Sequence, residues 1–181
     1  AMREMPIFSL RSEGIGQPWT CTTCGARDEG LPLCFGAEAP WSALVPEAEF
    51  EARVELNADL CVVDGSVFFI RGHIELPIVG TDEVFCWSIW CSLSEASFRH
   101  AMERWRDPER VGDAYFGWLC SPVSVYPSTL HLATTVRSRA VGEVPLMEVH
   151  ECEHPLYVDQ RDGISLDRVR EIAHALLHED E

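Results

Sequence analysis

The chain has 181 residues, of which 30 are Asp or Glu and 14 are Arg, and its formal net charge is −16. A protein that neutralises nucleic-acid phosphates needs a basic surface, so this charge argues against nucleic acid as a partner. Because every basic residue apart from histidine is Arg, the sequence also excludes enzymes that use a Schiff-base lysine and phosphate loops that need a Walker lysine.

Apolar residues make up 46% of the chain, but no apolar run approaches the roughly 20 residues that span a bilayer. We therefore expect no membrane segment, and the absence of a recognisable signal peptide favours a cytoplasmic location. In that compartment the eight cysteines are expected to be reduced or metal-bound rather than paired in disulfides. The length fits a single domain over residues 1–181.

The first part of the chain predicts little regular structure. Gly and Pro residues make 1–18 an irregular arm, and 19–36 form a cysteine knuckle followed by a loop that continues to Pro40. Pro46 then begins a short helix over 47–54, with acidic residues in its first turn, where the helix dipole favours them.

Residues 60–150 predict a sheet with an inserted helix. Asp64-Gly65 is a strong two-residue hairpin signal between strands at 60–63 and 67–78. Further strands are expected at 84–93, 115–120, 129–139 and 146–149. Residues 115–120 could form a buried loop in place of a strand. The strands are joined by short turns, which favour antiparallel pairing.

Two longer helices complete the prediction. One follows a capping box at Ser92 and Glu95 and runs to about Trp105, and the other covers 165–178 with Ser165 as its cap. The expected fold is α+β, an antiparallel sheet of about five or six strands with two or three packed helices and an N-terminal zinc-knuckle-like arm.

A Cys-x-x-Cys pair at Cys21 and Cys24, followed by a Gly, can direct two thiolates at one metal ion. Structural zinc needs four ligands, and the best complement is Cys152 and His154, which project on one side if 150–154 is extended. Three further residues could replace one of these ligands: Asp28, Cys34 and His150. The same pattern is compatible with a metal-free thiol pair in a loop.

The remaining cysteines, Cys61, Cys86, Cys91 and Cys120, lie inside apolar strand segments. Buried cysteine behaves as a small hydrophobic residue, so core packing is expected for all four.

Alternation along 67–78 places two sets of side chains on opposite faces of the strand. The apolar set is Phe68, Ile70, Gly72, Ile74 and Leu76, and the other set is Phe69, Arg71, His73 and Glu75. A second strand offers His131, Thr135, Arg137 and Arg139.

If the sheet register places the two polar rows on one face, Arg71, Arg137, Arg139 and His131 could hold a small anionic ligand. His73 and Glu75, with Arg71 beside them, are the candidate catalytic residues, as an acid–base pair. A solvated, salt-bridged sheet face is the alternative.

Several short motifs together resemble one bacterial family, the domain of unknown function number 2199, from Trp19 to His178. The motifs are CTTCG at 21–25, LPL at 31–33, FG at 35–36, DLCV at 59–62, FFIRG at 68–72, ELP at 75–77, WSIWCSLS at 87–94, YFGWL at 115–119, YPSTL at 126–130, HPL at 154–156 and QRDGI at 160–164. The resemblance implies no activity, because none is established for that family. Its pattern includes His154 and has a His where this chain has Asp28, so Cys152 would be a local substitute.

These observations favour a protein that binds a structural zinc ion and has a binding or regulatory role. The first alternative is an enzyme that acts on a small anionic ligand through Arg71, His73 and Glu75. The second is an acidic immunity or inhibitor protein, whose surface would dock a basic protein partner.

Overall fold

The computed structural model describes residues 7–9, 19–20, 27–28 and 30–178. The strands are β1 (Ile7–Ser9), β2 (Trp19–Thr20), β3 (Arg27–Asp28), β4 (Cys34–Ala37), β5 (Val54–Leu56), β6 (Leu60–Val63), β7 (Val67–Pro77), β8 (Val84–Leu93), β9 (Ala114–Leu119), β10 (Ala133–Arg137) and β11 (Leu146–Val149). The α-helices are α1 (Phe50–Arg53), α2 (Glu95–Glu103), α3 (Pro155–Asp162) and α4 (Leu166–Leu177), and the 3-10 helices are η1 (Pro40–Ala43), η2 (Glu47–Glu49) and η3 (Pro108–Arg110). The expected mixed α+β class is confirmed.

A long antiparallel pair, β7 with β8, forms the centre of the fold. Ten consecutive residue pairs join the two strands, from Phe68 opposite Leu93 to Pro77 opposite Val84. The turn that leads into β7 has the predicted geometry, since Asp64 (φ 52°) and Gly65 (φ 64°) both take the left-handed conformation that a type I′ hairpin requires.

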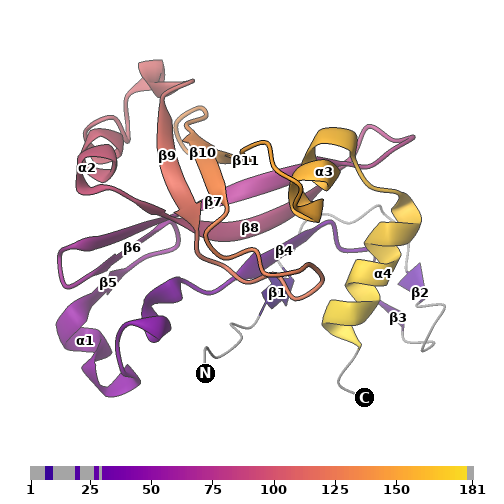
Figure 1. Ribbon diagram of the computed structural model, residues 1–181, viewed down its shortest axis with the longest axis horizontal. Coiled ribbons are helices and arrows are strands. Elements are labelled where there is room, and N and C mark those ends of the chain that lie inside the picture. Colours follow the sequence, from indigo (N-terminus) through magenta and orange to yellow (C-terminus); the bar gives the residue numbers. More distant parts are fainter. Residues whose placement is uncertain (1–6, 10–18, 21–26, 29, 179–181) are drawn as a thin grey trace.

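The second edge of each central strand is divided between two neighbours. β8 pairs first with β4 and later with β9, while β7 pairs first with β6 and later with β11. Because β9, β10 and β11 pair in turn, the strands β7–β8–β9–β10–β11 close into a five-stranded barrel (Figure 1). β6 and β5 extend the sheet beyond β7, and β4 and β1 extend it beyond β8.

The prediction of about five or six antiparallel strands was therefore too low in number, and antiparallel pairing holds for all the neighbouring strands of the described main sheet except two pairs. In the part of the chain that the structure describes, the main sheet has nine strands, and it is mixed because β4 pairs parallel with β8 and β11 pairs parallel with β7. Parallel neighbours are joined by long connections rather than tight turns, so no local signal in the sequence marks them.

Residues 30–40, expected to be a loop, contain β4, whose four residues are all buried. A strand covered on both faces shows a continuous apolar run instead of alternation, and the Gly and Pro residues around β4 obscured that run. The arm at 1–18 was likewise expected to be irregular, but Ile7–Ser9 forms β1 and pairs antiparallel with β4.

The helix termini differ from the prediction in two places. Ser94, not Ser92, caps α2 and accepts a hydrogen bond from the Ser97 amide, because β8 continues to Leu93. The segment 150–154 bends instead of extending, and α3, which was not predicted, begins directly after it with Pro155 in its first turn. Ser165 caps α4 as expected.

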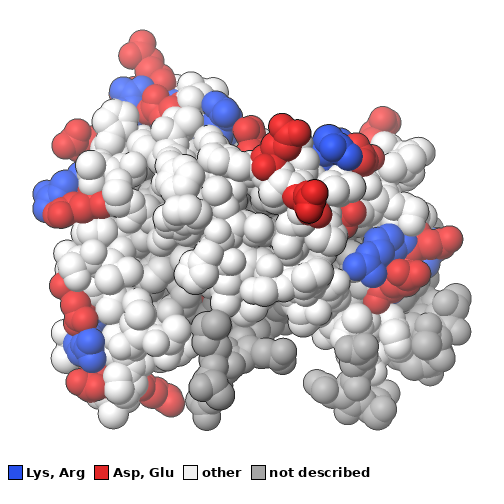
Figure 2. All heavy atoms as spheres, viewed as in Figure 1, with Lys and Arg blue, Asp and Glu red and all other residues white. Residues whose placement is uncertain are grey.

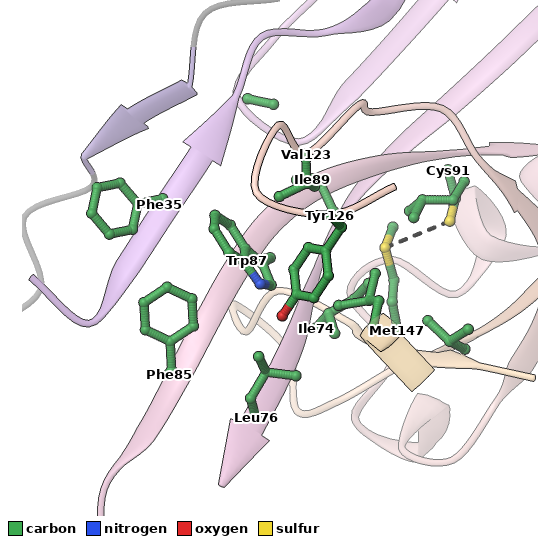
Figure 3. Packing of buried hydrophobic residues seen from close by; sticks show 14 of the residues in the cluster. Phe35, Ile74, Leu76, Phe85, Trp87, Ile89, Cys91, Val123, Tyr126 and Met147 are labelled. Atoms are coloured by element: carbon green, nitrogen blue, oxygen red, sulfur yellow. Dashed lines mark hydrogen bonds between the residues drawn. The ribbon is translucent and has the colours of Figure 1, made fainter. Parts of the chain in front are cut away.

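The main core contains the apolar face of β7 and β8 and the barrel interior. Figure 3 shows Phe35, Phe85 and Trp87 grouped at one end of this core and Met147 directed toward Cys91, whose thiol donates to the Met147 sulfur at 3.6 Å. Gly72 makes room for Met147, since a Cβ at Gly72 would lie 2.6 Å from its Cγ. Helices cover this core through Phe98 and Ala101 of α2, Leu156 of α3, and Val169, Ile172 and Ala173 of α4.

A smaller apolar cluster lies on the opposite face of the β7–β8 pair. It joins Phe69 of β7 and Trp90 of β8 to residues before and after η1, Ala39 and Val45. The segment from η1 to α1 thus covers one end of the outward face of these strands and leaves the part around Arg71, His73 and Glu75 for polar side chains.

Within the described residues, no helix is long and apolar enough to cross a membrane. On the face shown in Figure 2, acidic and basic side chains lie beside one another around the outline, and the centre of the face carries neither. Several acidic and basic side chains of the protein form ion pairs, such as Arg53 with Asp64 at 2.8 Å.

Gly163 ends α3 at φ 83° and ψ 174°, a conformation that only glycine adopts readily, and a Cβ there would lie 2.6 Å from the Pro77 carbonyl oxygen. We expect Gly163→Ala to lower the free energy of unfolding by about 1–3 kcal/mol, measured by urea denaturation. Gly142→Ala is the matched control, because at Gly142 (φ 89°) no atom lies within 4 Å of the position that the new methyl group would take. Equal losses in both variants would show that the Pro77 contact contributes nothing.

Candidate metal centre

The polar row predicted on β7 lies on the outward face of the central pair, as the alternation indicated. Ile70, Ile74 and Leu76 belong to the main core, whereas Arg71, His73 and Glu75 are partly exposed on the other side. At one end of this row, Phe69 belongs to the smaller apolar cluster. At the other end, Glu75 forms an ion pair with Arg139.

Three metal-ligating side chains meet on this face. Cys34 of β4 lies directly opposite Cys86 of β8 in the register of these two strands. On the other side of β8, His73 of β7 lies opposite Ser88, two residues from Cys86. One donor atom from each residue lies within 4.8 Å of the others, so Cys34, His73 and Cys86 could hold a metal ion. We call this group the Cys–His–Cys cluster.

The cluster is shielded from solvent. Cys34 and Cys86 are 7% and 8% exposed, and the Nε2 atom of His73 is buried with no hydrogen-bond partner among the described residues. A buried polar atom without a partner costs about 1–3 kcal/mol, so such atoms are uncommon in folded proteins.

The surroundings shift the protonation equilibria of all three donors. Burial, together with the positive charges of Arg71 and Arg139, lowers the pKa of His73 to about 4, so its imidazole is neutral at pH 7. A hydrogen bond from the Cys86 thiol lowers the pKa of Cys34, and burial opposes this effect. The same bond and burial raise the pKa of Cys86.

Glu75 borders the cluster without joining it. It lies directly opposite Cys86 in the β7–β8 register, and its carboxylate accepts a hydrogen bond from Arg139 Nη1 at 2.7 Å. Arg139 also donates to the Val144 carbonyl at 2.7 Å, which holds the guanidinium in place. The predicted acid–base residues His73 and Glu75 therefore share one face, but Glu75 is engaged in an ion pair.

Arg71, on the other side of His73, is held by three partners. It donates from Nε to the Ala58 carbonyl at 2.7 Å, from Nη1 to Ser88 Oγ at 2.8 Å, and from Nη2 to Asp59 Oδ1 at 3.0 Å. Ser88 is fully buried and lies opposite His73, so it connects the cluster to the residues around Arg71.

The four predicted anion-binding residues are only partly brought together. Arg71 and Arg139 flank His73, but each is paired with a carboxylate, and Arg137 pairs with Glu148 at 3.1 Å. His131 is exposed in a turn at φ 66°. The observed pairs match the salt-bridged sheet face that was the alternative interpretation.

Of the predicted zinc ligands, the two that the structure describes, Cys152 and His154, lie outside the Cys–His–Cys cluster. Cys21 and Cys24 are outside the described residues, while Trp19–Thr20 and Arg27–Asp28, which flank them, pair antiparallel. Cys152 is exposed, and His154 is the N-cap of α3.

Both ring nitrogens of His154 are engaged, since Nδ1 accepts from the Leu156 amide at 3.0 Å and Nε2 lies 3.0 Å from the Pro127 carbonyl oxygen. His150, a reserve ligand, has its Nε2 2.8 Å from Thr135 Oγ1.

The other strand cysteines follow the prediction to different extents. Cys61 and Cys91 are fully buried in apolar clusters, as expected. Cys120 is partly exposed, and Cys86, although buried, contacts Cys34 instead of serving only as packing.

The sequence suggests a separate role for each member of the Cys–His–Cys cluster: Cys34 as a reserve ligand, Cys86 as packing, and His73 as a catalytic candidate. Their convergence depends on the parallel register between β4 and β8, which no spacing in the sequence reveals.

A family model described as an uncharacterised protein conserved in bacteria, DUF2199, matches residues 20–164. The chain belongs to this family. The match includes Cys34, His73 and Cys86, and it confirms the resemblance noted from the sequence motifs. No curated protein and no solved structure matches the chain.

Thiol accessibility provides a test of this arrangement. Burial raises the pKa of Cys61 to about 11 and of Cys91 to about 12, so both should resist iodoacetamide at pH 8 in the folded protein, whereas exposed Cys152 should react first. Peptide mass spectrometry over a time course measures the order. Labelling of Cys61 or Cys91 as fast as Cys152 would contradict the burial of these two thiols.

Proposed function

We propose that this protein binds zinc and that the Cys–His–Cys cluster is its principal metal site. One observation carries the proposal: donor atoms of Cys34, His73 and Cys86, contributed by three different strands, lie within 4.8 Å of one another in a largely buried position. Two thiolates and one neutral imidazole are ligands that zinc prefers, whereas magnesium and calcium prefer oxygen.

The position of the cluster supports a structural contribution. Cys34 lies on β4, whose backbone pairs with β8 along a short parallel stretch at Cys86–Ser88. A bound ion would fasten β4 to both β7 and β8. A binding or regulatory role for the protein, in a reducing cytoplasmic environment that preserves free thiolates, forms part of the proposal.

The enzyme alternative is favoured by the number of ligands. Structural zinc has four protein ligands, whereas catalytic zinc has three and keeps the fourth position for water or substrate. The cluster supplies three protein donors, and Glu75 lies on the same face, where a carboxylate could exchange protons with a metal-bound water. In this second candidate function, His73 acts as a ligand instead of an acid–base group.

A second zinc site at Cys21 and Cys24 remains part of the proposal. The antiparallel pairing of Thr20 with Arg27 is compatible with a knuckle between them. Cys152 is exposed and available as a ligand, but His154 would have to exchange its hydrogen bonds to the Pro127 and Ser128 carbonyls for a metal bond.

Metal analysis tests the principal site. Protein purified under reducing conditions without chelator should contain zinc, and Cys34→Ser and Cys86→Ser should each lower the zinc content by about one equivalent, because each removes one of the three donors. Inductively coupled plasma mass spectrometry, normalised to protein concentration, provides the measurement.

Cys120→Ser is the control, since Cys120 lies directly after β9, is partly exposed and is not in the cluster, and this variant should leave the zinc content unchanged. The zinc content of a Cys21→Ser variant tests the proposed second site at Cys21 and Cys24 separately. Zinc content that is unaffected by both cluster variants would overturn the proposal for the principal site.

A further inference from the structure

A cavity of about 790 Å³ lies beside the Cys–His–Cys cluster, on the same outward face of β7 and β8. Its lining includes Arg71 and Ser88 of the central strands, residues of the segment that runs from β4 through η1 to α1, and residues 56–58 at the end of β5. Its size falls within the range of small-molecule sites. No residue of the metal cluster lines it, so its occupant can be considered independently of the metal.

Three aromatic side chains line the cavity. Trp41 of η1 and Phe50 of α1 meet edge to face with ring centroids 4.7 Å apart, and Trp90 of β8 contributes a third ring. Trp90 is held in place because its Nε1 donates to the Ala37 carbonyl oxygen at 3.0 Å. Aromatic faces carry partial negative charge and attract cations that approach them.

The charged groups of the cavity also favour a positively charged ligand. Glu38, Glu47 and Glu51 line it and are exposed, and none of them forms an ion pair within the described part of the chain. The one positive residue of the lining, Arg71, is paired with Asp59 and bonded to Ser88. Three free carboxylates against one neutralised guanidinium give the cavity a negative potential.

We propose that this cavity binds a small organic cation, of the quaternary or methylated ammonium class. Such a group is large, apolar at its surface and weakly hydrated, so it gains from contact with Trp41 and Phe50. The three carboxylates compensate its charge without requiring direct hydrogen bonds. An anion in the cavity would be repelled by the carboxylates of Glu38, Glu47 and Glu51.

The ligand class can be tested with two probes of nearly the same shape. Choline carries a trimethylammonium group, and 3,3-dimethylbutan-1-ol has a neutral tert-butyl group in its place. Isothermal titration calorimetry at low ionic strength should show choline binding about 10-fold more tightly, because cation–π and charge attraction together contribute at about this level. Added salt should reduce the difference in affinity between the two probes, because it screens the attraction between charges.

Variants locate the site. Glu51→Gln removes one carboxylate from an exposed position and should weaken choline binding about 3-fold without changing the affinity of the neutral probe. Trp41→Leu should weaken choline binding about 10-fold. Trp118→Leu is the matched control, because Trp118 is an exposed tryptophan on β9 outside the cavity. This variant should bind choline with the affinity of the unchanged protein.

Circular dichroism confirms that each variant is folded before titration. Equal affinity for the two probes, no detectable choline binding, or an equal loss in the Trp41 and Trp118 variants would each overturn the inference. Since none of these measurements depends on zinc, failure here leaves the metal proposal untouched.

Discussion

The pairing of β7 with β8 is the constraint on which the rest of the structure depends. Ten residue pairs fix one register, and a shift by one residue would exchange the two faces of both strands. With this register, Ile74, Trp87 and Leu76 enter the main core, and His73 and Cys86 lie on the opposite face. The core and the candidate site are therefore determined by the same set of backbone hydrogen bonds.

Two parallel additions complete the site. β4 places Cys34 beside Cys86, and β11 borders β7 where Leu146 lies opposite His73. The turn before β11 brings Arg139 to Glu75, so residues far apart in the sequence surround one imidazole. The aromatic cavity arises from the same arrangement, because the chain that leaves β4 must cross the outward face of β8 before it reaches α1.

Local patterns in the sequence predicted much of this framework. The alternation along 67–78, the Asp64-Gly65 turn and the cap at Ser165 predicted correct strands, faces and a correct helix, because each depends on neighbouring residues. The sequence did not indicate β4 or the closure of the barrel, which depend on pairing between distant segments. For the same reason the cluster was not predicted, although Cys34, His73 and Cys86 each drew attention separately. The Cys21–Cys24 knuckle lies outside the described residues and stays a prediction.

Metal binding at the Cys–His–Cys cluster would have a thermodynamic consequence. A ligand that binds only the folded chain stabilises it by an amount that grows with the logarithm of the free ligand concentration. If zinc occupies the cluster, unfolding releases the ion, and the folded fraction becomes a function of zinc availability. In a zinc-poor cell the chain would spend more time unfolded and be degraded sooner, so the amount of this protein would follow the metal supply.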